Sequence, residues 1–393
     1  MSVFDQLVGQ DHAVEILHAT AAGRSAMTHA WLFTGPPGSG RSIAARAFAA
    51  ALQCDSAEPG CGICPSCHTV LAGTHADVAV VTPQGLSLGV REAREMVARA
   101  ALAPSGRKWQ IMLIEDADRL TESAANVLLK AIEEPAARTV WLLCVPAAQD
   151  LVVTIRSRCR VVTLRTPPVR AVAQMLVTRD AVPPEVADGC ARAAAGHVGR
   201  ARRLATDATA RARRAAVLDV TASLGDVAGC LGAAAALVDS AAAEASAATT
   251  PLDEAETASL KEAFGEGGTA TGVGRGTSGA AITRGAVRGA ATALKDLESK
   301  QKSRATRAQR DALDRALIDL AGLYRDVLVI QLGGAVDVAN VDYTPQITEL
   351  AAASTPEATL RRLDAILDCR TLLQANANPL LAVEAMTLAL RAG

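Results

Sequence analysis

The chain has 393 residues, of which 50% are hydrophobic and only 2% aromatic, and its formal net charge at pH 7 is -1. This length predicts two or three domains rather than one, and a hydrophobic content supplied largely by alanine favours helix-rich packing over a β-sandwich. The balanced charge excludes a generally basic protein that coats nucleic acid, but it allows local basic patches.

The first residues of the chain show no recognisable targeting signal. Residues 1–6 lack the basic and apolar regions of a signal peptide. An alanine-rich stretch at about 233–248 contains Asp239 and Glu244, so we expect a water-soluble helix there rather than a membrane span. The sequence therefore predicts a cytoplasmic protein with no membrane partner.

Apolar runs of strand length alternate with helical patterns over residues 1–165, which is typical of an α/β domain with a parallel sheet. Helices are expected over 41–52, over about 90–100, and after Thr121, which is a candidate N-cap. The expected strands are 29–34, 77–82, 109–114, 140–145 and 160–164.

Residues 35–42 read Gly-Pro-Pro-Gly-Ser-Gly-Arg-Ser and follow the first expected strand. The glycines Gly35, Gly38 and Gly40, with Ser42, fit a phosphate-binding loop whose backbone N–H groups close around phosphates. Arg41 stands where the motif has lysine, and a forked guanidinium does not replace a compact ammonium. Arginine supplies 34 of the 40 basic residues, so a general replacement of lysine by arginine in this chain explains the presence of Arg41. It does not change the shape of the arginine side chain. We expect ATP hydrolysis by this chain to be weak or absent.

Four cysteines lie within fourteen positions as C-x6-C-x2-C-x2-C: Cys54, Cys61, Cys64 and Cys67. Four thiolates at this spacing suit one tetrahedral Zn²⁺ and leave no open position for a catalytic water, so the predicted site is structural. A chain without a signal peptide also favours metal binding over disulfides. The alternatives are unrelated buried cysteines and substitution of one ligand by His68.

An acidic pair, Glu115 and Asp116, follows the strand expected at 109–114. After a phosphate loop, one carboxylate of such a pair holds Mg²⁺ and the other orients the attacking water. The order here is inverted relative to the usual Asp-Glu, and a solvated strand end would carry the same residues. The backbone amides of the loop can still hold ATP or ADP without turnover, and Mg²⁺ is expected only if nucleotide binds.

Thr166-Pro167-Pro168 predicts a domain boundary, after which the pattern is helical almost throughout. We expect an α/β domain over 1–165 with its zinc module at 54–67, a small helical domain over 166–215 and a longer helical domain over 216–393. A stretch at about 241–293 is rich in Ala, Gly, Thr and Ser, which predicts a flexible insert.

Five motifs occur in order: residues 4–10 (FDQLVGQ), the phosphate loop, the four cysteines, residues 126–135 (NVLLKAIEEP) and Ser157-Arg158-Cys159. Together they resemble the bacterial clamp-loader branch of the AAA+ ATPases over most of the first 210 residues. The resemblance implies an AAA+ P-loop core, a small helical lid and a C-terminal all-α collar.

Within that family, Arg158 corresponds to an arginine finger that reaches a nucleotide held by a neighbouring subunit, although a lone arginine at this place would be an ordinary surface residue. Val145-Pro146 stands where working relatives carry a polar sensor residue, and Arg200 lies one position late in the second sensor region. These departures resemble a subunit that does not hydrolyse ATP itself. The implied partners are other loader subunits, of the gamma/tau and delta types, the sliding clamp, and primer–template DNA through the assembled complex.

Two other interpretations remain. The chain is either an active ATPase subunit of the same complex or a zinc-containing protein that binds nucleic acid or another protein. The candidates for DNA phosphate contacts alternate with acidic residues, which is also typical of a solvated helix face. They are Arg91, Arg94, Arg99, Arg107 and Lys108.

Overall fold

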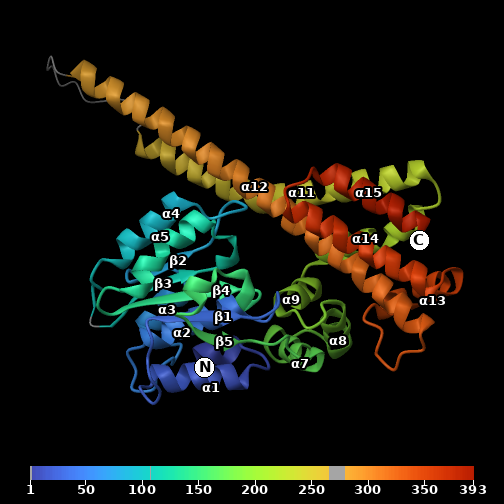
Figure 1. Ribbon diagram of the computed structural model, residues 1–393, viewed down its shortest axis with the longest axis horizontal. Coiled ribbons are helices and arrows are strands. Elements are labelled where there is room, and N and C mark those ends of the chain that lie inside the picture. The colour runs from blue at the N-terminus through green and yellow to red at the C-terminus, as the bar shows by residue number, and fades with distance from the viewer. Residues whose placement is uncertain (1, 107, 265–278) are drawn as a thin grey trace. The chain divides into compact units, whose positions relative to one another are not determined.

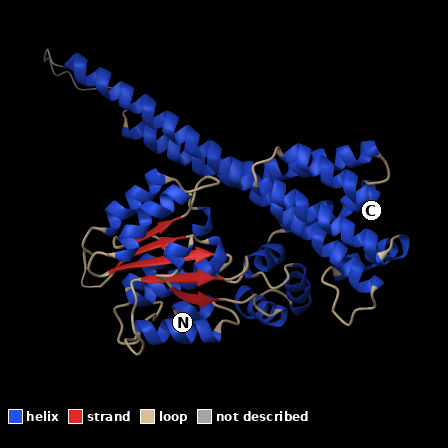
Figure 2. Ribbon diagram, in the orientation of Figure 1, coloured by secondary structure: helices blue, strands red, loops and turns tan. Residues whose placement is uncertain are grey.

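The computed structural model describes residues 2–106, 108–264 and 279–393, and the chain divides into two units, Met1–Arg211 and Ala212–Gly393. The first unit is built on a five-stranded, fully parallel sheet with the strand order β2-β3-β4-β1-β5 (Figures 1 and 2). All five expected strands are present, with bounds within two residues of those predicted. They are β1 Ala30–Thr34, β2 Val78–Val81, β3 Gln110–Ile114, β4 Thr139–Val145 and β5 Arg160–Thr163.

Alternate side chains of the strands enter two separate cores. Trp31 and Phe33 of β1 pack with α1, α2 and α3, whereas Leu32 packs with α4, α5 and α6 on the other face. Because both faces are covered, the strands read as continuous apolar runs in the sequence. The helices are α1 Asp11–Ala21, α2 Arg41–Leu52, α3 Pro65–Leu71, α4 Val90–Ala100, α5 Glu122–Glu133 and α6 Val153–Arg156.

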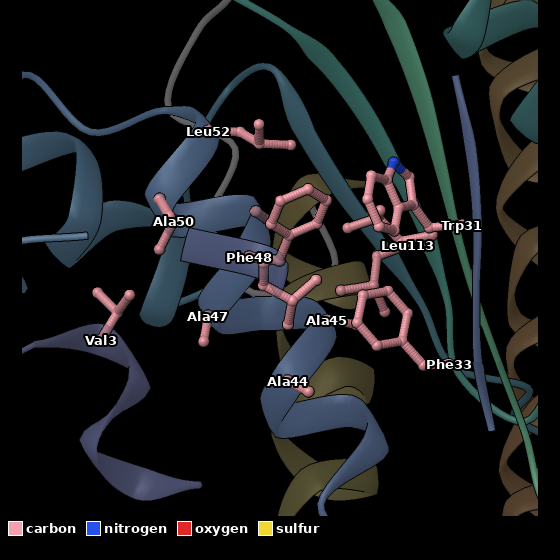
Figure 3. Packing of buried hydrophobic residues seen from close by; sticks show 14 of the residues in the cluster. Val3, Trp31, Phe33, Ala44, Ala45, Ala47, Phe48, Ala50, Leu52 and Leu113 are labelled. Carbon is pink, nitrogen blue, oxygen red and sulfur yellow. The ribbon is translucent and has the colours of Figure 1, made fainter. Parts of the chain in front are cut away.

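The helix that follows the phosphate loop, α2, is fixed tightly to the sheet. Its Phe48 lies edge-on to Trp31, with ring centroids 4.8 Å apart, and also contacts Phe33 (Figure 3). Small side chains such as Ala44 and Ala45 allow the helix to approach the strands closely. This packing holds the N-terminus of α2, and with it the phosphate loop, in one place.

Three short helices complete the first unit and form a core of their own through residues such as Val172, Leu176, Ala187 and Ala191. They are α7 Val169–Asp180, α8 Pro184–Ala193 and α9 Val198–Thr206, and α10 Ala208–Asp219 follows them across the division between the two units. Single turns of 3-10 helix occur at η1 Val3–Gln6, η2 Ala117–Arg119 and η3 Ala148–Asp150.

The second unit is helical. Its core combines Leu317, Leu320 and Tyr324 of α12 with residues of α11, α14 and α15. The helices are α11 Val227–Ala263, α12 Gly279–Gln331, α13 Thr344–Ala353, α14 Pro356–Gln374 and α15 Pro379–Ala392, with 3-10 turns at η4 Val220–Ser223 and η5 Val341–Tyr343.

The expectation of a flexible insert at about 241–293 needs correction, because its described residues are helical up to Ala263 and again from Gly279. Residues 265–278 lie outside the described residues. Alanine has the highest helix propensity of all residues, and here it outweighs the glycine and threonine around it. Partner helices add support, since Arg304 of α12 lies 2.6 Å from Asp253 and 2.9 Å from Glu256 of α11.

Helix α11 is the one described helix long and apolar enough, by length and composition, to cross a membrane, and 28% of its most apolar window is buried. Its Cys230, Ala234 and Leu237 belong to the core shared with α12, α14 and α15. Part of its apolar surface is therefore packed within the helical unit.

Candidate functional site

The phosphate loop joins β1 to the N-terminus of α2. Its glycines Gly35, Gly38 and Gly40 all have positive φ, at 151°, 85° and 92°, a conformation that favours glycine and turns successive backbone N–H groups inward. Ser39 is buried, and its Oγ has no hydrogen-bond partner among the described residues. A buried hydroxyl without a partner beside a helix N-terminus suits an incoming anion such as a phosphate.

A pocket of about 210 Å³ lies beside this loop. Its walls are residues 6–8 near the chain start, loop residues 38–43, Pro167, and residues 197–199 at the start of α9. Typical small-molecule pockets measure about 300–1,000 Å³. The pocket is therefore smaller than most small-molecule sites.

His197 is the residue that narrows the pocket. A Cβ placed on Gly38 would lie 2.3 Å from Cγ of His197, so the imidazole ring lies directly against the phosphate loop. The same ring caps α9, because its Nδ1 accepts a hydrogen bond from the Arg200 backbone N–H at 3.2 Å. Burial, together with the nearby charge of Arg200, lowers the pKa of His197.

Arg41 does not extend from the loop as the motif's lysine would. Its Nη1 donates a hydrogen bond to the carbonyl oxygen of Gly35, within the loop itself. The guanidinium is therefore bound to the backbone of its own loop. In the motif, the side chain at this position binds phosphate oxygens instead.

The acidic pair is also engaged within the chain. Oε1 of Glu115 lies 3.0 Å from Nε of Arg46, and its Oε2 accepts a hydrogen bond from Thr82 Oγ1 at 2.9 Å. Asp116 adopts the left-handed conformation, with φ 50°. A Mg²⁺ ion at Glu115 would have to displace Arg46, so the acidic pair in this arrangement does not fit a magnesium centre.

Asp118 is a third acidic residue at this edge of the sheet, and the sequence analysis missed it. Its Oδ1 is buried and has no hydrogen-bond partner among the described residues. Burial raises the pKa of Asp118, and the negative charge of Asp116 acts in the same direction. The spacing Glu-Asp-Ala-Asp was the available signal.

The first sensor position offers no polar side chain. Val145 ends β4 and is fully buried, and the carbonyl of Pro146 accepts the N–H of Gly35 at 3.0 Å. This position therefore supports the loop through its backbone and cannot bind a phosphate or a water through a side chain.

The four predicted zinc ligands, Cys54, Cys61, Cys64 and Cys67, come together. Their sulfurs all lie within 4.8 Å of one another, and the Sγ atoms of Cys54 and Cys64 are 3.9 Å apart. A tetrahedral site with Zn–S bonds of about 2.3 Å requires sulfurs roughly 3.8 Å apart, so the donor set fits Zn²⁺. Cys64 also caps α3 by accepting the N–H of Cys67.

The thiols of this cluster differ in their surroundings. A hydrogen bond from Ser56, helped by backbone N–H groups, lowers the pKa of Cys61 to about 6. Burial raises the pKa of Cys67, whose sulfur lies in the core beneath α2. The cluster therefore lies between solvent and core, where a bound ion would tie the surface loop to the domain.

Arg158 follows α6, near the C-terminal end of α5. Its Nη1 donates to the Thr154 carbonyl at 2.7 Å and to Ser157 Oγ at 3.2 Å, and its Nη2 lies 2.5 Å from Oε1 of Glu133. The side chain is 38% exposed. The motifs at residues 126–135 and 157–159 are thus joined by an ion pair.

The candidates for DNA phosphate contacts are mostly engaged elsewhere. Arg91 pairs with Glu92 at 3.3 Å, Arg99 donates to the Ala76 carbonyl at 3.2 Å, and Lys108 donates to the Cys54 carbonyl. Residue 107 lies outside the described residues. These contacts support a structural or solvated role for this part of the surface.

Residues 9–168 match the model of a family described as DNA polymerase III, delta subunit. This segment, less than half of the chain, is therefore similar to subunits of DNA polymerase III. The chain is 33% identical to DNA polymerase III subunit tau of Bacillus subtilis over 160 residues, which are 40% of this chain and 28% of that protein. It is 35% identical to subunit delta' of Pseudomonas aeruginosa over 149 residues, which are 37% of this chain and 45% of that protein.

The matched stretch spans less than half the length of each of these clamp-loader relatives. Among solved structures, a DNA polymerase III gamma subunit-related protein of Thermotoga maritima is 14% identical, with a TM-score of 0.40 over 96% of this chain and 99% of that one. The predicted α/β core with a parallel sheet and flanking helices, followed by a C-terminal helical region, is confirmed.

Proposed function

We propose that this chain is a delta-prime-type subunit of the DNA polymerase III clamp loader, which hydrolyses little or no ATP itself and supplies Arg158 to the ATP site of a neighbouring subunit. One observation carries the proposal. Arg158 is exposed and held by three acceptors of its own chain. At this chain's own nucleotide site, Arg41 is bound to a backbone carbonyl and Glu115 is paired with Arg46.

Three features argue against hydrolysis at this chain's own loop. Arg41 binds the carbonyl of Gly35, Glu115 is paired with Arg46, and Val145 provides no polar sensor. Phosphoryl transfer depends on positioned charges around the transferring group. Each of these three features removes a charge or hydrogen-bonding group from the position around the transferring phosphoryl group, or engages it elsewhere.

A guanidinium supplied by another subunit can take over part of this task. Arg158 would offset the negative charge that develops on the transferring phosphoryl group, an effect that accounts for roughly 10³-fold or more in rate in related nucleotide hydrolases. The proposal assigns to this chain the other loader subunits, of the gamma/tau and delta types, as partners. The sliding clamp and primer–template DNA would be met through the assembled complex in the bacterial cytoplasm.

The four cysteines would hold one structural Zn²⁺, which supplies no catalytic chemistry because all four positions are filled by thiolates. The loop at 35–42 would bind ATP or ADP through backbone N–H groups, with Ser39 as an additional donor. The nucleotide would then have a structural role in this subunit.

Turnover by the isolated chain tests the first half of the proposal. We expect no ATP hydrolysis above background, and we expect Arg41→Lys to leave that result unchanged because Glu115 and Val145 still lack their catalytic roles. Robust hydrolysis by the unmodified chain would contradict the assignment.

A second candidate is an active, gamma/tau-type ATPase subunit. The observation that favours it is the similarity to tau of Bacillus subtilis, which at 33% nearly equals the similarity to delta' of Pseudomonas aeruginosa. This candidate requires hydrolysis by the isolated chain and its loss in Arg41→Ala. The same turnover assay therefore separates the two functions.

A further inference from the structure

The chain begins with a segment, residues 2–10, that connects the cysteine cluster to the nucleotide pocket. We call it the N-terminal strap. At its start, the backbone N–H of Val3 donates to the Gly60 carbonyl at 2.9 Å, and Ser2 Oγ donates to the same oxygen at 3.3 Å. Gly60 lies directly before the second zinc ligand, Cys61. The strap is thus anchored to the loop that the zinc would fix.

Packing at this anchor is tight. Gly60 has φ 84°, and a Cβ placed on it would lie 3.0 Å from Val3 Cγ2 and 3.2 Å from the Phe4 ring. Val3 and Phe4 are each only 4% exposed and share one hydrophobic core with Cys54 and Cys67. A shift of the cysteine loop would therefore be transmitted to the strap.

The other end of the strap forms part of the pocket. Residues 6–8 line it, and Gln10 holds the phosphate loop by donating from Nε2 to the carbonyl of Ser39 at 3.1 Å. The amide of Gln10 also donates to the Arg165 carbonyl at 2.6 Å and accepts the Arg165 N–H at 3.2 Å. Gln10 is 5% exposed, so these hydrogen bonds are shielded from water.

We propose that the zinc knuckle positions one wall of the nucleotide pocket through the N-terminal strap, so that zinc binding strengthens nucleotide binding. The inference rests on the proposed binding of nucleotide at residues 35–42. Zinc fixes residues 54–67, Gly60 then holds Val3, and the strap places residues 6–8 and Gln10 against the loop. Coupling of this kind is reciprocal, so nucleotide must also strengthen zinc retention.

The test uses the full chain in zinc-loaded form and after removal of zinc by a chelator. Amide exchange of residues 2–10 reports the strap directly, and binding of fluorescently labelled ADP reports the pocket. We expect zinc removal to accelerate exchange across the strap and to weaken ADP binding about 10-fold. ADP should in turn slow the release of zinc to a chromogenic chelator. Unchanged strap exchange and unchanged ADP affinity in zinc-free protein that remains folded would overturn the proposal.

A pair of glycine variants covers the case in which zinc removal unfolds the protein. Gly60→Ala introduces a methyl group against Val3 and Phe4, whereas Gly73→Ala carries the same left-handed strain, with φ 74°, and meets nothing within 4 Å. We expect both variants to retain one zinc ion per chain by metal analysis and only Gly60→Ala to lose strap protection and ADP affinity. Equal behaviour of the two variants would contradict the proposal. If the unmodified chain binds no ADP, the nucleotide assignment is wrong, and the exchange data alone then decide whether the zinc knuckle holds the strap.

Discussion

The guanidinium of Arg158 is held from two sides by groups of its own chain. Glu133 lies at the end of α5, where the inward-facing Ile132 is fully buried and fixes the helix. Ser157 and the carbonyl of Thr154 hold the other side of the guanidinium. The sequence predicted Arg158 from its motif, but it could not predict the pairing with Glu133, because that contact joins segments that are 25 positions apart and depends on how α5 and α6 pack.

Glu133→Gln tests whether this contact matters for the proposed finger. The ion pair is half exposed, so its contribution is at most about 1 kcal/mol. We expect kcat for ATP hydrolysis by the assembled loader to fall about 2- to 5-fold with KM unchanged, because the finger is less well oriented. Glu134→Gln changes the neighbouring carboxylate and serves as the control. An equal loss in both variants would assign the effect to surface charge rather than to Arg158.

His197 makes the stability of the first unit depend on pH. Its folded-state pKa is lowered, so the unfolded chain binds the proton more readily than the folded chain does. Stability is therefore full above the unfolded value of about 6.5 and declines as the pH falls from there towards the folded pKa. Protonation also removes the Nδ1 acceptor that caps α9.

The variant His197→Asn keeps a capping acceptor but cannot titrate. We expect urea unfolding to show a smaller loss of stability between pH 7.5 and pH 5.5 in His197→Asn than in the unmodified chain. Identical pH dependence in the two proteins would show that His197 does not contribute.

At the scale of elements, local patterns predicted the first unit better than the second. The strands of the sheet and helix α2 followed from apolar runs and from the loop motif, since each of these signals lies within a dozen residues. The segment at 241–263 was misjudged because its helix is stabilised by a partner: Asp253 and Glu256 meet Arg304 from about 50 positions away. No local pattern carries that information.

Arg304→Ala should loosen this part of α11. Arg304 is only 14% exposed and bridges two carboxylates, so its removal should lower the local opening free energy by about 1–2 kcal/mol. We expect amide exchange over residues 250–263 to accelerate about 5- to 30-fold. Lys302→Ala removes an exposed charge two positions away on the same helix and should leave exchange unchanged. Similar acceleration in both variants would contradict the role of the bridge.

For the whole molecule, the sequence predicted which parts would be present but not how they are linked. The phosphate loop and the four cysteines were recognised separately, whereas the strap between them depends on the contact of Val3 with Gly60 and of Gln10 with Ser39. The pair of Arg46 and Glu115 was likewise hidden, because Arg46 read as an ordinary residue of an alanine-rich helix. Such contacts are long-range properties of the folded chain.

The central claim is that this chain completes a neighbour's ATP site with Arg158 and does not use its own. The most direct measurement is DNA-stimulated ATP hydrolysis by the loader reconstituted with its partner subunits, with this chain either unmodified, as Arg158→Ala, or as the control Arg156→Ala. The account predicts that all three complexes assemble and that only Arg158→Ala lowers kcat, by roughly 10³-fold at the affected site. Undiminished hydrolysis and clamp loading with Arg158→Ala would contradict it.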